Sequence, residues 1–483
     1  MSRQTGLHTS VSRRSFMAAS ATAATLLLPR ELTAASGNSL NNSRTLGQVD
    51  TASPEGWRMW HLETAASLRP SAPGAATQAE IDEIVAIQAQ ATPEAAEAPD
   101  PVAMWGTVPA SLSWSKLAAE LFTEFKIGPG LPQSRTLAIL YTAMHDASIA
   151  AWDAQLAHSR PGPAATDSRI VPALGVVVDQ PSFPSEHAAV AGAAAAVFAY
   201  VFVDAEAGRF DQLAIDAAES RMAAGAAFRS DIDAGLDMGK TVAEMAIARA
   251  RDDGSDATWD PATKPSGPGV WQPTPPMFVD PPGSPMGGSR TPWVMSSGDQ
   301  FRPAPPPEYG SEAWQAELAQ VQHIVANRDF EQNRAAVWWG TSSANLHVSE
   351  WAQDLIVRSG TSSPLAAKIL ADVHVAVDDA LIGCWDGKFA YWTSRPITED
   401  PTLVTSVPSP PYPAYPGGYA TVVGSGSTVI GHYFPEASVD LEERAWEATC
   451  SRLWAGIHYG IDNDAGLLLG RRVGRLIAAL DTA

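Results

Sequence analysis

Cationic residues near Pro396 are spaced so that they could bind an oxyanion. Lys388 and Arg395 lie in one segment, and Pro396 follows Arg395 directly. Seven residues of α-helix turn through about 700°, so Lys388 and Arg395 would share one helix face. Pro396 would place Arg395 near a helix end. Ammonium and guanidinium groups are suited to neutralising the oxygens of a phosphate-like anion.

A second cluster follows closer to the C-terminus and contains Arg452, His458 and Asp462. Six residues advance about 600°, which would put Arg452 and His458 on different faces of a straight helix. A break at Gly456 would let a loop return His458 to the pocket. Asp462 or Asn463 would then cap the last helix.

The elements that must position these clusters occur twice in the chain. Three pairs of segments match in the same order, at offsets of 231 to 233 residues: 143–153 with 376–386, 183–188 with 415–420, and 220–239 with 451–470. Such a repeat predicts a duplicated architecture. Segments 188–202, 213–227 and 236–250 are rich in Ala and Leu at helical spacing, and long alternating β-branched runs are lacking. We expect an all-α protein with two repeated helical bundles.

The domain organisation follows from this repeat and from composition. Prolines in 251–310 cannot continue helices, and the aromatic residues among them indicate a connector that packs on the surface. We predict five parts, namely an export signal (1–35), an Ala/Pro-rich arm (36–110), a first helical repeat (111–250), a proline-rich connector (251–310) and a second helical repeat with the oxyanion site (311–483).

The N-terminus and the composition indicate where the protein acts. Arg13 and Arg14 precede an apolar stretch that is too short to span a bilayer, which resembles a bacterial twin-arginine signal. We expect a secreted or periplasmic protein without stable membrane insertion. The formal charge of −21 argues against a nucleic-acid partner, and two cysteines exclude a multi-thiolate zinc site.

The order of these motifs resembles the signature of the vanadium-dependent haloperoxidases and the related type 2 phosphatidic acid phosphatases. That signature reads K-x6-R-P, then P-S-G-H, then S-R-x5-H-x3-D. The first and third parts match fully here, at Lys388 to Pro396 and at Ser451 to Asp462. The middle part is Pro-Gly-Gly-Tyr, so Gly417 stands for the family serine and Tyr419 for the family histidine.

The resemblance implies a cofactor and a role for each matched residue. Vanadate, or phosphate in its place, would be bound by Lys388, Arg395, Arg452 and the backbone N–H of Gly418. His458 would bind vanadium, and Lys388 would also polarise bound peroxide. Asp462 would orient the loop that carries His458.

The implied activity is peroxide-driven halide oxidation, and two alternatives stay open. One is hydrolysis of a phosphate ester through a phosphohistidine at His458. The other is non-catalytic binding of phosphate or vanadate, because Tyr419 is a poor acid–base group at neutral pH. For Tyr419 we favour a hydrogen-bonding pocket residue over catalysis.

The first repeat lacks part of the signature. It keeps Arg160, His187 and Arg221, but Gln155 replaces the lysine and Ala227 replaces the metal-binding histidine. We interpret His187 as a buried histidine satisfied by helix ends, with a catalytic role as the less favoured alternative. Whether Cys384 and Cys450 pair stays open, and His145 and His374 are weak metal-ligand candidates.

Overall fold

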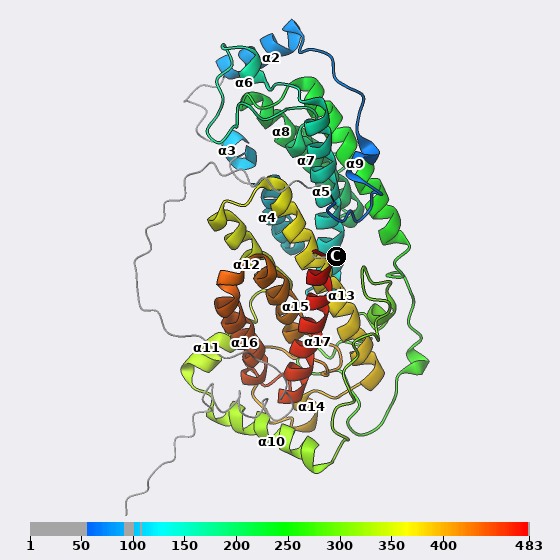
Figure 1. Ribbon diagram of the computed structural model, residues 1–483. Coiled ribbons are helices and arrows are strands. Elements are labelled where there is room, and N and C mark those ends of the chain that lie inside the picture. The colour runs from blue at the N-terminus through cyan, green and yellow to red at the C-terminus, as the bar shows by residue number, and fades with distance from the viewer. Residues whose placement is uncertain (1–55, 91–100, 107–108, 482–483) are drawn as a thin grey trace, which may run out of the picture. The chain divides into compact units, whose positions relative to one another are not determined.

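The computed structural model describes residues 56–90, 101–106 and 109–481, so the export signal predicted for 1–35 lies outside the described residues. The described residues belong to one compact unit. They form helices and loops, and their only β-type pairing is an isolated bridge between Val270 and Thr393 (Figure 1). The predicted all-α class is therefore confirmed.

Two sets of helices follow one another in the same order. The first set is α4 (Ala110–Glu124), α5 (Leu131–His158), α6 (Pro163–Thr166), α7 (Glu186–Val201), α8 (Arg209–Ala223) and α9 (Arg229–Arg251). The second set is α12 (Ala344–Ser359), α13 (Ser363–Tyr391), α14 (Pro396–Glu399), α15 (Gly418–Tyr433), α16 (Ser438–Trp454) and α17 (Gly460–Ala478). The longest members, α5 and α13, are followed directly by the C-cap residues Ser159 and Trp392, and both of these residues have left-handed backbone. This order agrees with the duplication expected from the matched segments.

Glycines allow the closest helix contacts in each set. A Cβ added at Gly239 of α9 would lie 1.9 Å from the carbonyl oxygen of Ala189 of α7. The same addition at Gly470 of α17 would lie 2.1 Å from the carbonyl oxygen of Thr421 of α15. Since any side chain would collide with backbone there, the matched small residues of the repeat are explained by packing.

The two sets pack against each other through α5 and α13, which run side by side (Figure 1). The ring of Tyr141 on α5 stacks on His374 of α13, with 4.4 Å between the ring centroids. Ser134 Oγ donates a hydrogen bond of 2.8 Å to Asp378. His374 is therefore a core residue between the two sets.

Two extended segments bind equivalent aspartates on the long helices. Asp146 of α5 accepts hydrogen bonds from the backbone N–H groups of residues 60, 61 and 62. Asp379 of α13 accepts them from residues 293, 294 and 295. Arg69 pairs with Asp153 and Arg302 with Asp386 in the same way. We call residues 57–70 and 290–303 the first and second straps. The repeated contacts thus include parts of the predicted arm and connector.

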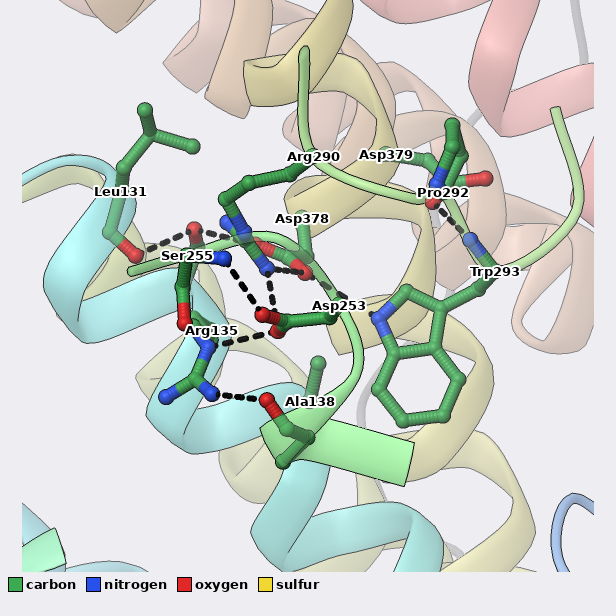
Figure 2. A network of polar contacts seen from close by, with 12 residues as sticks. Leu131, Arg135, Ala138, Asp253, Ser255, Arg290, Pro292, Trp293, Asp378 and Asp379 are labelled. Atoms are coloured by element: carbon green, nitrogen blue, oxygen red, sulfur yellow. Dashed lines mark hydrogen bonds and ion pairs between the residues drawn. The ribbon is translucent and has the colours of Figure 1, made fainter. Parts of the chain in front are cut away.

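A buried network of charges holds the second strap at the junction of the two sets (Figure 2). Arg290 donates to Asp378 through two nitrogens, at 3.1 and 2.9 Å. Trp293 Nε1 also donates to Asp378, at 3.1 Å. Arg135 donates to Asp253 at 2.6 Å. These opposite charges balance one another, which is the condition under which charged groups are tolerated in a protein interior.

The remaining elements lie between or beside the two sets. They are α2 (Gln78–Gln90), α3 (Pro101–Gly106), α10 (Glu312–Asn327), α11 (Phe330–Trp338) and the 3-10 turns Ala65–Leu68, Pro261–Thr263, Gly287–Ser289, Pro435–Ala437 and Ala479–Asp481. Within the connector, Trp271 is fully buried while Phe278 is exposed. None of the described helices is long and apolar enough to cross a membrane.

Candidate oxyanion site

The candidate site residues singled out in the sequence lie at or between helix ends of the second set. They are Lys388 in the last turn of α13, Arg395 at the N-cap of α14, Gly418 at the start of α15, Arg452 in the last turn of α16, His458 in the loop before α17 and Asp462 in the first turn of α17. Hydrogen bonds join the loops that carry Lys388, Arg395, His458 and Asp462. Arg452 lies near enough to His458 for its charge to lower the pKa of that histidine.

The ammonium group of Lys388 is fully buried and fixes the loop before α15. It donates to the backbone carbonyls of Pro413 at 2.8 Å, Ala414 at 2.8 Å and Pro416 at 2.6 Å. An ammonium has three N–H donors, so these acceptors engage all of them. Burial lowers the pKa of Lys388. In this conformation Lys388 has no further N–H donor for a bound anion.

Arg395 is also fully buried, but it is not on the helix that carries Lys388. The prediction that the two share one helix face is wrong, because Trp392 adopts left-handed backbone and ends α13 first. The guanidinium donates from Nε to the carbonyl of Tyr412 at 2.9 Å and from Nη1 to that of Ile457 at 2.8 Å. Arg395 therefore joins the loop before α15 to the loop that carries His458.

His458 lies in the predicted break, since α16 ends at Trp454 and Gly456 has a φ of 77°. Its Nδ1 lies 2.9 Å from Oδ2 of Asp462, and its Nε2 lies 3.0 Å from Nη1 of Arg395. A guanidinium can only donate, so Nε2 accepts and the ring proton is on Nδ1, where it bonds Asp462. Burial and the neighbouring cations hold the pKa of His458 well below its usual value. The ring is thus neutral, with its Nε2 lone pair towards the cations.

Asp462 orients this ring from within α17. The helix begins at Gly460 with Tyr459 as its N-cap, so the prediction that Asp462 or Asn463 is the N-cap is wrong. Asp462 lies in the first turn, and its Oδ2 also accepts the Tyr459 N–H at 3.0 Å. Burial raises the pKa of Asp462. One carboxylate therefore caps the helix and fixes the histidine tautomer.

Arg452 and Tyr419 form the side of the site nearest α11. Arg452 donates to Oγ of Ser451 at 2.9 Å and to the carbonyl of Ala336 at 2.8 Å, and its guanidinium lies 4.9 Å from the centroid of the Tyr419 ring. The Tyr419 hydroxyl is buried and has no hydrogen-bond partner among the described residues, so its role as a hydrogen-bonding pocket residue stays a prediction. Burial raises the pKa of Tyr419. Its ring holds Arg452 by a cation–π contact.

Positive charge exceeds negative charge in this site. Lys388, Arg395 and Arg452 are all buried, and none forms an ion pair with a carboxylate in the part of the chain that the structure describes. Asp462 is hydrogen-bonded to His458 instead. Burial lowers the pKa of Arg452 to about 10. Uncompensated buried cations favour a bound anion.

The N-terminus of α15 adds backbone donors to this positive region. Its N-cap is Gly417, which has no side chain to bond the first N–H groups of the helix. The equivalent helix α7 is capped by Ser185, whose Oγ accepts the N–H of Ala188. An uncapped helix N-terminus is suited to anion binding because of its free N–H groups and the helix dipole.

The space around Gly417 explains why serine is absent there. Its N–H donates to the carbonyl of Asp462 at 2.7 Å. A Cβ at Gly417 would lie 2.9 Å from that carbonyl oxygen and 3.2 Å from Oδ1 of Asn463. At Gly418 the nearest atom to an added Cβ, on Trp385, is 3.6 Å away. The close approach of α17 therefore requires glycine at 417 but not at 418.

Two aromatic rings cover the cations. Tyr412 lies with its ring centroid 5.2 Å from Lys388 Nζ and 5.3 Å from the Arg395 guanidinium, and 4.9 Å from the ring of Trp385. The repeat identifies Trp385 only as a core residue. Sequence reasoning gives no signal for Tyr412, because it lies in a proline-rich run outside every matched motif.

In the first set, the counterparts of Lys388 and Arg395 carry no unpaired charge. Gln155 donates from Nε2 to the carbonyl of Pro184 at 2.8 Å, which is the contact that Lys388 makes with Pro416. Arg160 pairs with Asp231 at 2.6 Å. An amide thus replaces the ammonium, and a carboxylate neutralises the guanidinium.

His187 and the other secondary candidates are placed as follows. Nε2 of His187 is buried without a hydrogen-bond partner among the described residues, so the prediction of a satisfied histidine is wrong. Cys384 and Cys450 are buried and unpaired. No group of three or more His, Cys, Asp or Glu side chains able to hold a metal ion occurs among the described residues, and His145 bonds Asp146 instead.

Comparison with known proteins identifies the fold. No protein-family model matches the sequence, and no curated protein matches it significantly. The structure is similar to that of a bacterial vanadium-dependent iodoperoxidase, with a TM-score of 0.62 and 21% identity over 77% of this chain and 95% of that one. It is also similar to a bacterial vanadium-dependent chloroperoxidase in its apo form (TM-score 0.52, 15% identity, 72% and 93% covered) and its holo form (0.53, 14%, 80% and 96%). The chain therefore has the fold of the vanadium-dependent haloperoxidases.

Proposed function

We propose that the chain is a haloperoxidase-like enzyme that binds vanadate at His458 and uses peroxide to oxidise halide. The observation that carries the proposal is the convergence of Lys388, Arg395 and Arg452, buried and without carboxylate partners, on a neutral histidine. The shared fold of proteins described as iodo- and chloroperoxidases supports it.

The chain's residues fit an oxyanion of the vanadate or phosphate type. Arg395, Arg452 and the N–H groups at the start of α15 would neutralise its oxygens. Asp462 would keep the proton on Nδ1 of His458, so that Nε2 is free to bind vanadium once it exchanges its contact with Arg395. When bound, vanadate would supply a Lewis-acidic centre that activates peroxide towards halide.

Tyr419 sets the expected speed of this reaction. The phenol occupies the place of the family's acid–base histidine, its pKa is raised by burial, and its hydroxyl has no described partner to take or give a proton. Losing a general acid–base group costs about 10²–10⁴ in rate. We therefore expect slow turnover with intact oxyanion binding.

A second candidate function uses the same site on phosphate. His458 would attack a phosphate ester and form a phosphohistidine, or the site would bind phosphate or vanadate without turnover. Tyr419 and Gly417 favour the non-catalytic form, because neither replaces the function of the family residue it stands for.

An activity assay separates these functions. The mature protein is tested for iodide and bromide oxidation with peroxide, and for p-nitrophenyl phosphate hydrolysis, each with and without vanadate. Halide oxidation that requires vanadate and is lost in His458→Ala supports the proposal. The matched control is His432→Ala, because His432 lies on α15 and pairs with Asp481 outside the site.

The other outcomes contradict the proposal. Phosphate hydrolysis that vanadate inhibits would favour the phosphatase, and vanadate binding without either activity would favour the non-catalytic protein. Peroxide and halide as substrates, like twin-arginine export and secretion, stay predictions.

A further inference from the structure

The first set of helices contains a buried guanidinium that no described residue neutralises. Arg221 lies in the last turn of α8 and is 4% exposed. Its Nη1 is shielded from solvent without a hydrogen-bond partner, and no described residue accepts a hydrogen bond from the side chain or forms an ion pair with it. A guanidinium has five N–H donors, and buried polar groups are almost always satisfied. Burial lowers the pKa of Arg221 to about 10, which leaves it charged at neutral pH.

In the second set, the arginine at the equivalent position has hydrogen-bond partners. The equivalent Arg452 has two hydrogen-bond acceptors and lies against the ring of Tyr419. Arg221 instead packs under Gly106 at the end of α3, where an added Cβ would lie 1.7 Å from Nη1. Glycine leaves room for the guanidinium but supplies no side chain to bind it.

A second buried polar atom without a partner belongs to His187, which is close enough to Arg221 to feel its charge. Nε2 of His187, in the first turn of α7, is buried and has no partner in the described chain. Burial, and then the charge of Arg221, lower the pKa of His187 to about 3. The ring is neutral at neutral pH and can present an N–H to an acceptor.

Neighbouring carboxyl groups are engaged elsewhere. Glu186 accepts a hydrogen bond of 2.6 Å from Ser148. Asp231 pairs with Arg160. Arg221 thus retains one positive charge for which the described chain supplies no counter-ion.

We propose that Arg221 and His187 bind a small singly charged anion, in a site separate from the one at His458. The guanidinium supplies the charge and most of the donors, and His187 supplies one further N–H. Ala227 stands where His458 stands in the second set, so the anion has no covalent or metal-binding partner there and is held by hydrogen bonds and charge. The inference is independent of the proposed function.

Bromide is a suitable probe, because it is singly charged and detectable in crystals. Urea unfolding midpoints of the full mature chain are measured from zero bromide upwards, with gluconate, which is too large for such a site, keeping the ionic strength constant. We compare the wild type with Arg221→Met, and use Arg229→Met as control because Arg229 is a half-exposed arginine with carboxylate partners. Bromide at ten times its Kd should raise the folding equilibrium constant of the wild type about 11-fold relative to Arg221→Met.

Equal bromide dependence of the wild type and Arg221→Met would overturn the proposal. Any bromide bound at the His458 site contributes equally to both proteins and cancels. Anomalous scattering from a bromide-soaked crystal of the wild type tests the same site if Arg221→Met does not fold. A peak beside Nη1 of Arg221 supports the site, and no peak there overturns it, as does a crystal peak without any effect of Arg221→Met in solution.

Discussion

The two adjacent glycines at the start of α15 should respond oppositely to alanine. Gly417 and Gly418 differ in what an added Cβ meets, with backbone oxygen at 2.9 Å in the first case and an aromatic carbon at 3.6 Å in the second. Neither glycine has positive φ, so alanine is free of backbone strain at both positions. The comparison therefore isolates the close approach of α17.

The magnitudes follow from two opposing effects. Replacing glycine by alanine at a compatible position stabilises by about 0.4–1 kcal/mol, because the unfolded chain loses freedom. Overpacking at Gly417 costs about 1–3 kcal/mol, because the carbonyl of Asp462 would have to move and its 2.7 Å hydrogen bond from the Gly417 N–H would stretch. Gly418→Ala should thus stabilise slightly, and Gly417→Ala should be less stable than Gly418→Ala by about 1–3 kcal/mol.

Urea unfolding followed by tryptophan fluorescence, without added anion, measures this difference. The midpoint should fall for Gly417→Ala and should not fall for Gly418→Ala, with similar slopes for both. Equal or higher stability of Gly417→Ala would refute the claim that packing excludes a side chain at 417. The same reasoning predicts that Gly417→Ser, which restores the family residue, destabilises the site.

Three further predictions test other parts of the account. Tyr419→His should raise vanadate-dependent halide oxidation by about tenfold or more, since it restores an acid–base group, and an unchanged rate would contradict the role assigned to this position. Asp146→Asn and Asp379→Asn should each lower stability by about 2 kcal/mol in urea unfolding, because each removes a charged acceptor from three strap N–H groups; a loss at only one position would argue against equivalent straps. Burial lowers the pKa of His374 to about 3, so its contribution to stability is complete above pH 6.5 and is lost as pH falls towards 3. The pH dependence of stability between pH 6 and 4 should therefore flatten by up to about 1.4 kcal/mol per pH unit in His374→Gln, and an unchanged slope would refute the shifted pKa.

Sequence patterns predicted those features of the fold that depend on interactions between residues close together in the chain. The Ala- and Leu-rich segments predict the helices, and the glycine in the Arg452 to His458 segment predicts the break that places His458 in a loop. The matched segments predict the repeated order because each set must bury the same helix faces.

The features that depend on contacts between residues far apart in the chain could not be predicted from the sequence. Helical spacing suggested that Lys388 and Arg395 share a face, but their proximity comes from a chain reversal at Trp392, a residue type with no preference for left-handed backbone. The two straps could not be predicted from the sequence, because each is held through its backbone N–H groups. Every residue type except proline has such a group, so these contacts do not select particular residues. The acidic net charge likewise concerns the surface, whereas the site depends on a few buried cations.

The central claim is that the cations around His458 bind an oxyanion through that residue. Vanadium anomalous scattering from a crystal soaked in vanadate tests it most directly. The account predicts a peak at bonding distance from Nε2 of His458, within reach of Arg395 and Arg452, and no peak in His458→Ala. The absence of a peak in the wild type, or a peak away from His458, would contradict it.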